Sequence, residues 1–113
     1  MISITVVLDD SGLLKNCDVR GHAGAGTQGL DIVCAAVSVL TRTALATLSG
    51  REGLTVQGEA SRRGVFTLKT QALNETGWAY LYAVGNFLIE GLKSVAKEYP
   101  QNCTMKITKE RRS

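Results

Sequence analysis

The chain has 113 residues, of which 44% are hydrophobic and 20% charged, and its formal net charge is +3. This length and composition indicate one soluble globular domain, residues 1–113, and they exclude a disordered chain. No apolar run approaches the roughly 20 residues of a membrane span, and no signal peptide is visible. We therefore expect a cytoplasmic protein with no membrane partner, whose three cysteines stay reduced.

Two strands and a loop are predicted at the start of the chain. β-branched and apolar residues run from Ile2 to Leu8, and a second strand-like segment runs from Leu13 to Arg20. The turn residues Asp9 to Gly12 lie between them and predict a hairpin. Segment 21–29 then contains four glycines, Gly21, Gly24, Gly26 and Gly29. So much glycine disfavours both helix and strand, and a loop is predicted there.

The rest of the chain predicts two helices and three more strands. Apolar residues recur at helical spacing from Ile32 to Leu48, and Asp31 is the expected N-cap. A hairpin follows, and a second helix extends from about Glu75 to Tyr99, before Pro100. The expected strands are 54–59, 65–70 and 104–108, and the apolar stripe of the second helix is Trp78, Leu81, Tyr82, Leu88, Ile89, Leu92, Val95 and Ala96. The order ββαββαβ predicts an α+β fold with an antiparallel or mixed sheet packed against two helices.

Cys34 and His22 are the candidate catalytic residues. Cys34 is expected to be the third residue of the first helix, where unbonded N–H groups and the helix dipole favour a thiolate. The single histidine, His22, lies at the other end of the glycine loop, and the loop can bring the two side chains together. Such a pair is an activated nucleophile with its general base. The first-turn N–H groups and glycine amides are candidates for an oxyanion hole.

Asp31 and Ser38 are candidate supporting residues. Ser38 lies one helical turn after Cys34, where it can orient His22 or stabilise charge. Each residue also has a purely structural interpretation, since a lone cysteine is often buried and Asp31 can be a plain cap. Cys17, in an edge-like strand, and Cys103, in the last strand, have no base nearby in sequence and are assigned to structure.

Two other functions remain open at this stage. Gly24, Gly26 and Gly29 match GxGxxG between a strand and a helix, which is the context of a dinucleotide-binding loop, although the chain is short for that fold. The basic end of the chain, which includes Lys106, Lys109, Arg111 and Arg112, is compatible with a non-enzymatic RNA-binding module. With one histidine and no CxxC pair, no metal site is expected.

The segments Gly21-His22-Ala23, Gly29 and Asp31 to Ser38 together resemble the signature of the ribosomal-processing cysteine protease family, called Prp. The resemblance covers essentially the whole chain, including its length and order of elements. It implies a Cys–His dyad at Cys34 and His22, with Asp31 and Ser38 as supporting residues. It also implies that the glycine loop gates the cleft, and that no cofactor is needed.

The same resemblance implies a substrate and an assembly state. Members of the family remove a short N-terminal extension from a large-subunit ribosomal protein, number twenty-seven, and the apolar leader is cut after a phenylalanine. The expected partners are therefore this leader and a second copy of the chain in a homodimer, with no direct nucleic-acid binding. The loop interior, which includes Ala25 and Thr27, is smaller and richer in glycine than the family pattern leads us to expect, and Leu30 stands where polar residues are common.

Overall fold

The computed structural model describes residues 1–21, 28–62 and 64–111, and at 28–31, 61 and 62 it describes only the backbone. This part of the chain forms five strands and two helices in the predicted order, ββαββαβ. The strands are β1 (Ile2–Leu8), β2 (Leu14–Arg20), β3 (Leu54–Arg62), β4 (Val65–Ala72) and β5 (Cys103–Lys109). The helices are α1 (Gln28–Leu48) and α2 (Glu75–Glu98).

The five strands form one mixed sheet in the order β3-β4-β2-β1-β5. β1 pairs antiparallel with β2, β2 with β4, and β3 with β4, whereas β1 and β5 run parallel. Both predicted hairpins and the mixed sheet are therefore confirmed. β2 is the central strand, so the prediction that Cys17 lies in an edge-like strand is wrong. A local strand pattern cannot show which later strand, here β4, will pair with its free side.

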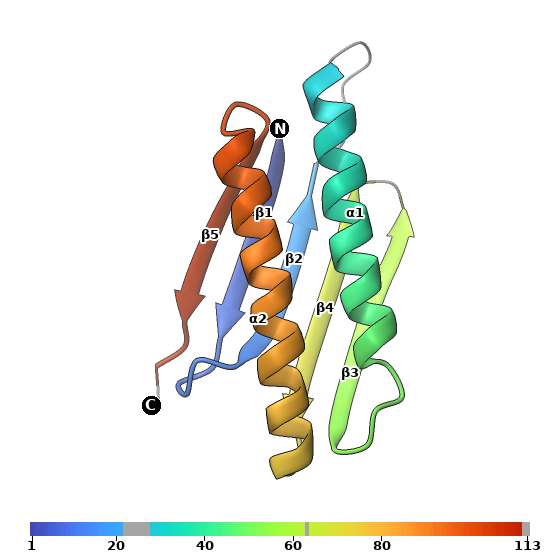
Figure 1. Ribbon diagram of the computed structural model, residues 1–113, viewed down its shortest axis with the longest axis vertical. Helices are drawn as coiled ribbons and strands as arrows, with labels where there is room; N and C mark the ends of the chain where they lie inside the picture. The colour runs from blue at the N-terminus through green and yellow to red at the C-terminus, as the bar shows by residue number, and fades with distance from the viewer. Residues whose placement is uncertain (22–27, 63, 112–113) are drawn as a thin grey trace.

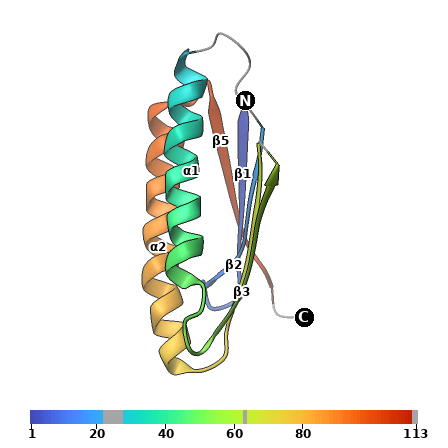
Figure 2. The same cartoon turned by 90° about the vertical axis from the view of Figure 1, so that its right-hand side faces the viewer.

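The helices α1 and α2 lie side by side on one face of the sheet, so the molecule has two layers (Figures 1 and 2). The hydrophobic core lies between these layers. β1 contributes Ile2, Ile4 and Val6 to it at alternate positions, as expected for a strand with one buried face. Neither described helix is long and apolar enough to cross a membrane.

The predicted apolar stripe of α1 is largely buried, whereas that of α2 is only partly so. Val33, Val37, Ala44 and Leu48 of α1 are in the core. In α2, Leu81, Leu88, Ile89 and Leu92 are buried, but Trp78 and Tyr82 are 40% and 48% exposed. Their rings stack on each other with centroids 5.0 Å apart. The prediction that they lie on the buried stripe is wrong, because each follows a buried residue, Gly77 or Leu81, by one position and so lies about 100° round the helix from the buried row.

Helix α1 begins earlier than the sequence predicts. Its first residue is Gln28, so the glycine loop does not extend to Gly29, and Asp31 is not the N-cap. A glycine in a helix costs about 1 kcal/mol relative to alanine. A helix of 21 residues that packs along the sheet offsets this cost, and the helix continues through Gly29.

Candidate active site

One end of the molecule brings together the segments that carry the predicted catalytic residues. The C-terminal end of β2, the turn between β3 and β4, and the first turn of α1 all lie there (Figure 1). The N–H of Gly21 donates to the carbonyl oxygen of Gly64 at 3.0 Å, which ties the end of β2 to that turn. The chain therefore enters and leaves segment 22–27 at the same end of the sheet.

Gly21 itself needs to be glycine. Its φ is +119°, a conformation that other residues rarely adopt. A Cβ atom at this position would also collide with the carbonyl oxygen of Met1. Close packing against the backbone of Met1 therefore requires glycine at position 21, just before segment 22–27. His22, Gly24 and Gly26 lie outside the described residues, and the predictions about the dyad and the gating loop stay predictions.

Cys34 is the seventh residue of α1, counted from Gln28, rather than the third. The free N–H groups and the dipole of a helix act mainly in its first turn. The prediction that Cys34 lies at the helix N-terminus is therefore wrong, whereas the assignment of first-turn N–H groups and glycine amides to an oxyanion hole stays a prediction. Cys34 is half-buried and packs against the core, so its thiol has both packed and open sides.

Cys34 belongs to a row of residues along one flank of α1. Ser38 and Leu45 follow it at four and eleven residues, spacings that place them on the same side of a helix. Ser38 is exposed, as a residue that contacts substrate must be. This flank of α1 lies over β3, since a Cβ atom on Gly58 of β3 would collide with the Leu45 side chain. Leu45 and Gly58 are not among the residues predicted for the site, although Leu45 stands at helical spacing from Cys34 in the sequence.

Asp31 lies in the first turn of α1, three residues before Cys34. Residues at this spacing share a helix face, so Asp31 belongs to the same flank as Ser38. Its side chain is outside the described part of the structure. The expected supporting role of Asp31 therefore stays a prediction, whereas the prediction that Asp31 is the N-cap of α1 is wrong.

The other two thiols are in the core. Cys17 in β2 is fully buried, and this burial, together with the charge of Asp18, raises the pKa of the Cys17 thiol to about 12. Burial also raises the pKa of Cys103 above its ordinary value. Both thiols stay protonated at neutral pH, whereas only the thiolate is a nucleophile. Their environments agree with a structural role for both residues.

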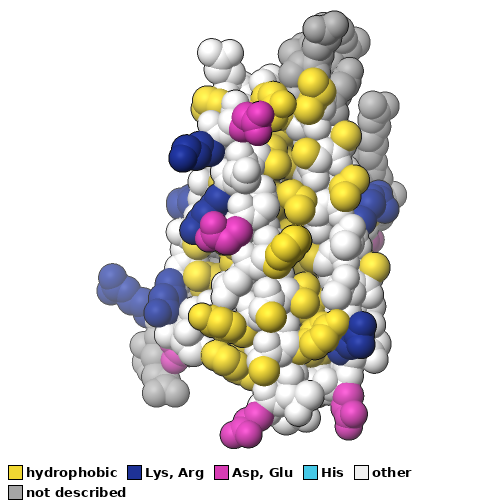
Figure 3. Space-filling model, viewed as in Figure 1, with side chains coloured by type: hydrophobic (Ala, Val, Ile, Leu, Met, Phe, Trp, Pro, Cys, Tyr) yellow, Lys and Arg dark blue, Asp and Glu magenta, His cyan; other side chains and the backbone are white. Residues whose placement is uncertain are grey.

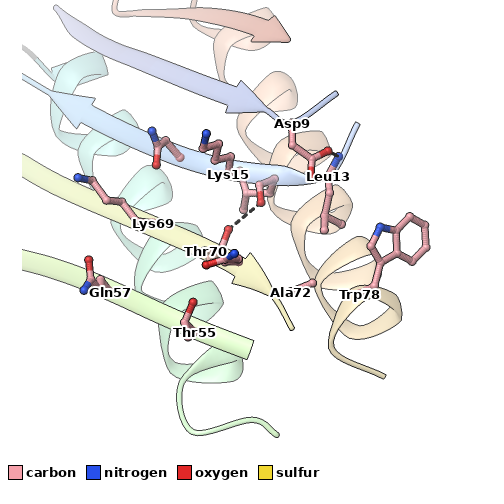
Figure 4. Close-up of a pocket in the computed structure, with 12 residues that line it drawn as sticks. Asp9, Leu13, Lys15, Thr55, Gln57, Lys69, Thr70, Ala72 and Trp78 are labelled. Carbon is pink, nitrogen blue, oxygen red and sulfur yellow. Dashed lines mark hydrogen bonds between the residues drawn. The ribbon is translucent and has the colours of Figure 1, made fainter. Parts of the chain in front are cut away.

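A separate hollow of about 670 Å³ lies at the opposite end of the molecule (Figure 4). Polar side chains from three strands line it, including Lys15, Lys69 and Gln57, and Trp78 stands at its side. The Thr70 hydroxyl donates to the carbonyl oxygen of Leu14 at 2.7 Å within it. None of its lining residues is a cysteine or a histidine, so this hollow is not the predicted catalytic site.

The topology argues against a dinucleotide-binding site at the glycine segment. That site requires adjacent parallel strands joined through a helix. Here β4 separates β2 from β3, and β3 enters a hairpin with β4. No group of three or more histidine, cysteine or acidic residues in the described parts of the chain is arranged to hold a metal ion.

A half-buried thiol in the second turn of a helix, in a chain whose single histidine lies twelve residues earlier, defines a candidate cysteine protease. Comparison with known families supports this class, because the model for the family described as cysteine protease Prp matches residues 1–104. The chain belongs to this family and is a cysteine protease. A search of curated proteins found no match.

Solved structures show the same fold over nearly the whole chain. A protein described as SMU.848 from Streptococcus mutans is 26% identical, with a TM-score of 0.79, and the match covers 97% of this chain and 96% of that one. An essential ribosomal processing protease Prp from S. aureus, in complex with a substrate peptide, is 20% identical, with a TM-score of 0.78. The same protease with a covalently linked product peptide is 21% identical, with a TM-score of 0.79. Both of these matches cover 95% of this chain and 99% of that one.

Proposed function

We propose that this cysteine protease is a single domain, residues 1–113, that processes a ribosomal protein in the cytoplasm. Its substrate is the apolar N-terminal leader of large-subunit ribosomal protein twenty-seven, cut after a phenylalanine. The observation that carries the proposal is the match to the Prp family over residues 1–104. The S. aureus structures with substrate and product peptides support it, since their fold is the same.

In the proposed mechanism Cys34 is the nucleophile and His22 its general base. His22 removes the thiol proton, and the Cys34 Sγ attacks the scissile carbonyl carbon to form a tetrahedral intermediate. The C–N bond then breaks as His22 returns the proton to the leaving amine, and an acyl-enzyme remains. Water, deprotonated by His22, hydrolyses the thioester and releases the leader. Asp31 and Ser38 orient the imidazole or stabilise charge from one turn on either side of Cys34.

The test of this mechanism is cleavage of a synthetic leader peptide, followed by mass spectrometry. Cys34→Ala is expected to abolish cleavage and to leave the circular dichroism spectrum unchanged, because Cys34 is only half-buried. His22→Ala is expected to lower the rate by at least about 100-fold, the lower range for a positioned general base. Cys103→Ala is the matched control and should retain cleavage. Wild-type rates in Cys34→Ala would disprove the mechanism.

We also propose that the protein is a homodimer that associates through the outer face of its two helices. Phe87 is 75% exposed and Val39 is 65% exposed on this face. They border an apolar groove of about 430 Å³ between α1 and α2, which Leu40, Ala83 and other uncharged side chains line. Figure 3 shows hydrophobic side chains gathered along both helices. A two-fold axis places this face against the same face of a second copy. The Phe87 ring of each copy then packs into the groove of the other.

A further inference from the structure

β3 is an edge of the sheet, and no strand within the described residues pairs with its outer main-chain groups. The N–H of Leu73 donates to the carbonyl oxygen of Gly53 at 2.8 Å, so residues 53 and 73 form a hydrogen-bonded pair. Such pairs alternate along an antiparallel ladder. In the register of β3 and β4, Thr55 and Gln57 therefore face β4 with their main-chain groups. The N–H and C=O groups of Leu54, Val56 and Gly58 point away from the sheet.

The side chains of β3 leave this edge open to another strand. Proteins usually protect sheet edges with lysine, proline, a β-bulge or a covering segment. β3 has nine residues and contains neither lysine nor proline, and its register with β4 is irregular only between Glu59 and Arg62, so residues 54–58 form a regular edge. β5, the other edge, carries Lys106 and Lys109. The two edges therefore differ, and β3 is the one that can accept an added strand.

The open edge leads to Cys34. β3 and α1 run in opposite directions (Figure 1). The Leu45 side chain lies over Gly58. Cys34 is eleven residues before Leu45, or about 16 Å along the helix at roughly 1.5 Å per residue. The same length corresponds to about five residues of strand at roughly 3.3 Å each. Counted from Gly58, Cys34 is therefore level with a point just past the end of β3 at Arg62, on the flank of α1 that faces this strand.

We propose that the β3 edge is the docking strand for the substrate leader, which adds to the sheet as an extended strand. This proposal rests on the proposed function and deepens it. Main-chain hydrogen bonds to Leu54, Val56 and Gly58 hold the peptide, and its scissile bond lies past Arg62, level with Cys34. Alternate side chains of the added strand face the helix layer, as Leu54 and Val56 do. The partner is therefore an extended peptide with apolar residues at alternate positions and no proline where it pairs.

The first test is a proline substitution that removes one outward N–H. Val56→Pro leaves the hydrogen bonds to β4 in place, since those come from Thr55 and Gln57. Its kcat/KM for the leader peptide is expected to fall at least tenfold, while the rate at which iodoacetamide alkylates Cys34 stays unchanged. A wild-type kcat/KM in folded Val56→Pro would overturn the proposal.

The matched control is a proline on the other edge. The N–H of Ile2 donates to Asn102 O, and the N–H of Glu110 donates to Leu8 O, so even-numbered residues of β5 face β1. Ile107, with its side chain 38% exposed, therefore directs its N–H outward. Ile107→Pro should retain the wild-type kcat/KM. An equal loss in both variants would attribute the effect to general damage and overturn the proposal.

A second measurement does not depend on these variants folding, or on cleavage. In Cys34→Ala, added leader peptide should slow hydrogen exchange at the amides of Val56 and Gly58, followed by NMR. The amides of Thr55 and Gln57, already bonded to β4, should change little. Peptide binding without new protection at Val56 and Gly58 would overturn strand addition and leave the protease intact. If wild-type enzyme binds the peptide with this protection but does not cut it, the proposed function fails and the docking strand stands.

Discussion

The three cysteines of this chain differ in how far their thiols are from water. Cys17 and Cys103 are buried, whereas Cys34 is half-buried. We expect iodoacetamide at neutral pH to modify Cys34 at least tenfold faster than the others, because burial raises the pKa of Cys17 to about 12 and that of Cys103 above its ordinary value. Mass spectrometry of the alkylated peptides gives the three rates. If Cys17 or Cys103 were modified faster than Cys34 in folded protein, the burial of these two thiols would be contradicted.

Asp9 controls the turn between β1 and β2. Its Oδ1 accepts hydrogen bonds from the N–H groups of Ser11 and Leu13, both at 2.9 Å, and from the Ser11 hydroxyl at 2.7 Å. Partial burial raises the pKa of Asp9, but these hydrogen bonds, which favour the charged form, outweigh it and lower the pKa below its ordinary value. The turn is therefore most stable when Asp9 is ionised.

This shift predicts an acid-dependent contribution of Asp9 to stability. The folded pKa lies below the unfolded value of about 3.9, so the contribution is complete above that value and is lost as the pH falls through the folded pKa. Asp9→Ala is expected to lower the free energy of unfolding by about 1 kcal/mol at pH 7. Urea denaturation at several pH values should show the difference shrinking below pH about 4. A difference that grows in acid would contradict the sign.

At the scale of elements, the start of α2 packs unusually close to the start of β3. The Asn74 side chain caps the helix by accepting a hydrogen bond from the N–H of Gly77 at 2.9 Å. A Cβ atom on Gly77 would collide with the carbonyl oxygen of Gly53, whose φ of +82° also requires glycine. The close packing of Gly53 and Gly77 and the cap at Asn74 therefore determine where α2 packs against the sheet.

Gly77→Ala is therefore expected to destabilise the protein by about 1–3 kcal/mol, because the backbone of Gly53 cannot turn aside. Gly91→Ala is the matched control in the same helix. Its new Cβ atom meets the tip of the Leu40 side chain at 2.8 Å, and a side chain can rotate. The gain in helix propensity, up to about 1 kcal/mol, offsets part of that contact. Urea denaturation gives the free energy of unfolding of both variants. An equal loss of stability in the two would contradict the proposed clash with the Gly53 carbonyl.

At the scale of the whole molecule, the two faces differ in character. The outer helix face presents Phe87 and Val39, whereas the open sheet face is mostly polar, with residues such as Thr104 and Lys106 exposed. This difference decides which face is proposed to meet a second copy. It also leaves the β3 edge and the flank of Cys34 outside that interface.

Phe87→Glu is expected to convert the proposed homodimer to a monomer, since it places a charge in the centre of the proposed apolar interface. Light scattering after size-exclusion chromatography gives the mass, and Thr104→Glu on the sheet face is the control that should remain dimeric. A dimer that persists in Phe87→Glu, or dissociates equally in Thr104→Glu, would show that the helix face is not the interface.

The sequence by itself determined the elements, their order and the family. Alternating apolar residues in Ile2 to Leu8 and the three- and four-residue spacing in both helices arise from local geometry, which a sequence pattern records directly. The candidate nucleophile and base were also inferred from residue types, because the chain has one histidine and only one of its three cysteines, Cys34, lies in a helical pattern. Family membership confirmed the class of enzyme.

Several features depend on contacts between residues far apart in the chain, and only the tertiary structure decided them. The central place of β2 and the edge position of β3 follow from which strands pair across the sheet. The exposure of Trp78 and Tyr82 follows from which side of α2 packs on the sheet. Helix α1 begins at Gln28 because contacts along the sheet offset the helix cost of Gly29, which no local pattern records. The contact of Leu45 with Gly58 is of the same kind, since it joins α1 to β3.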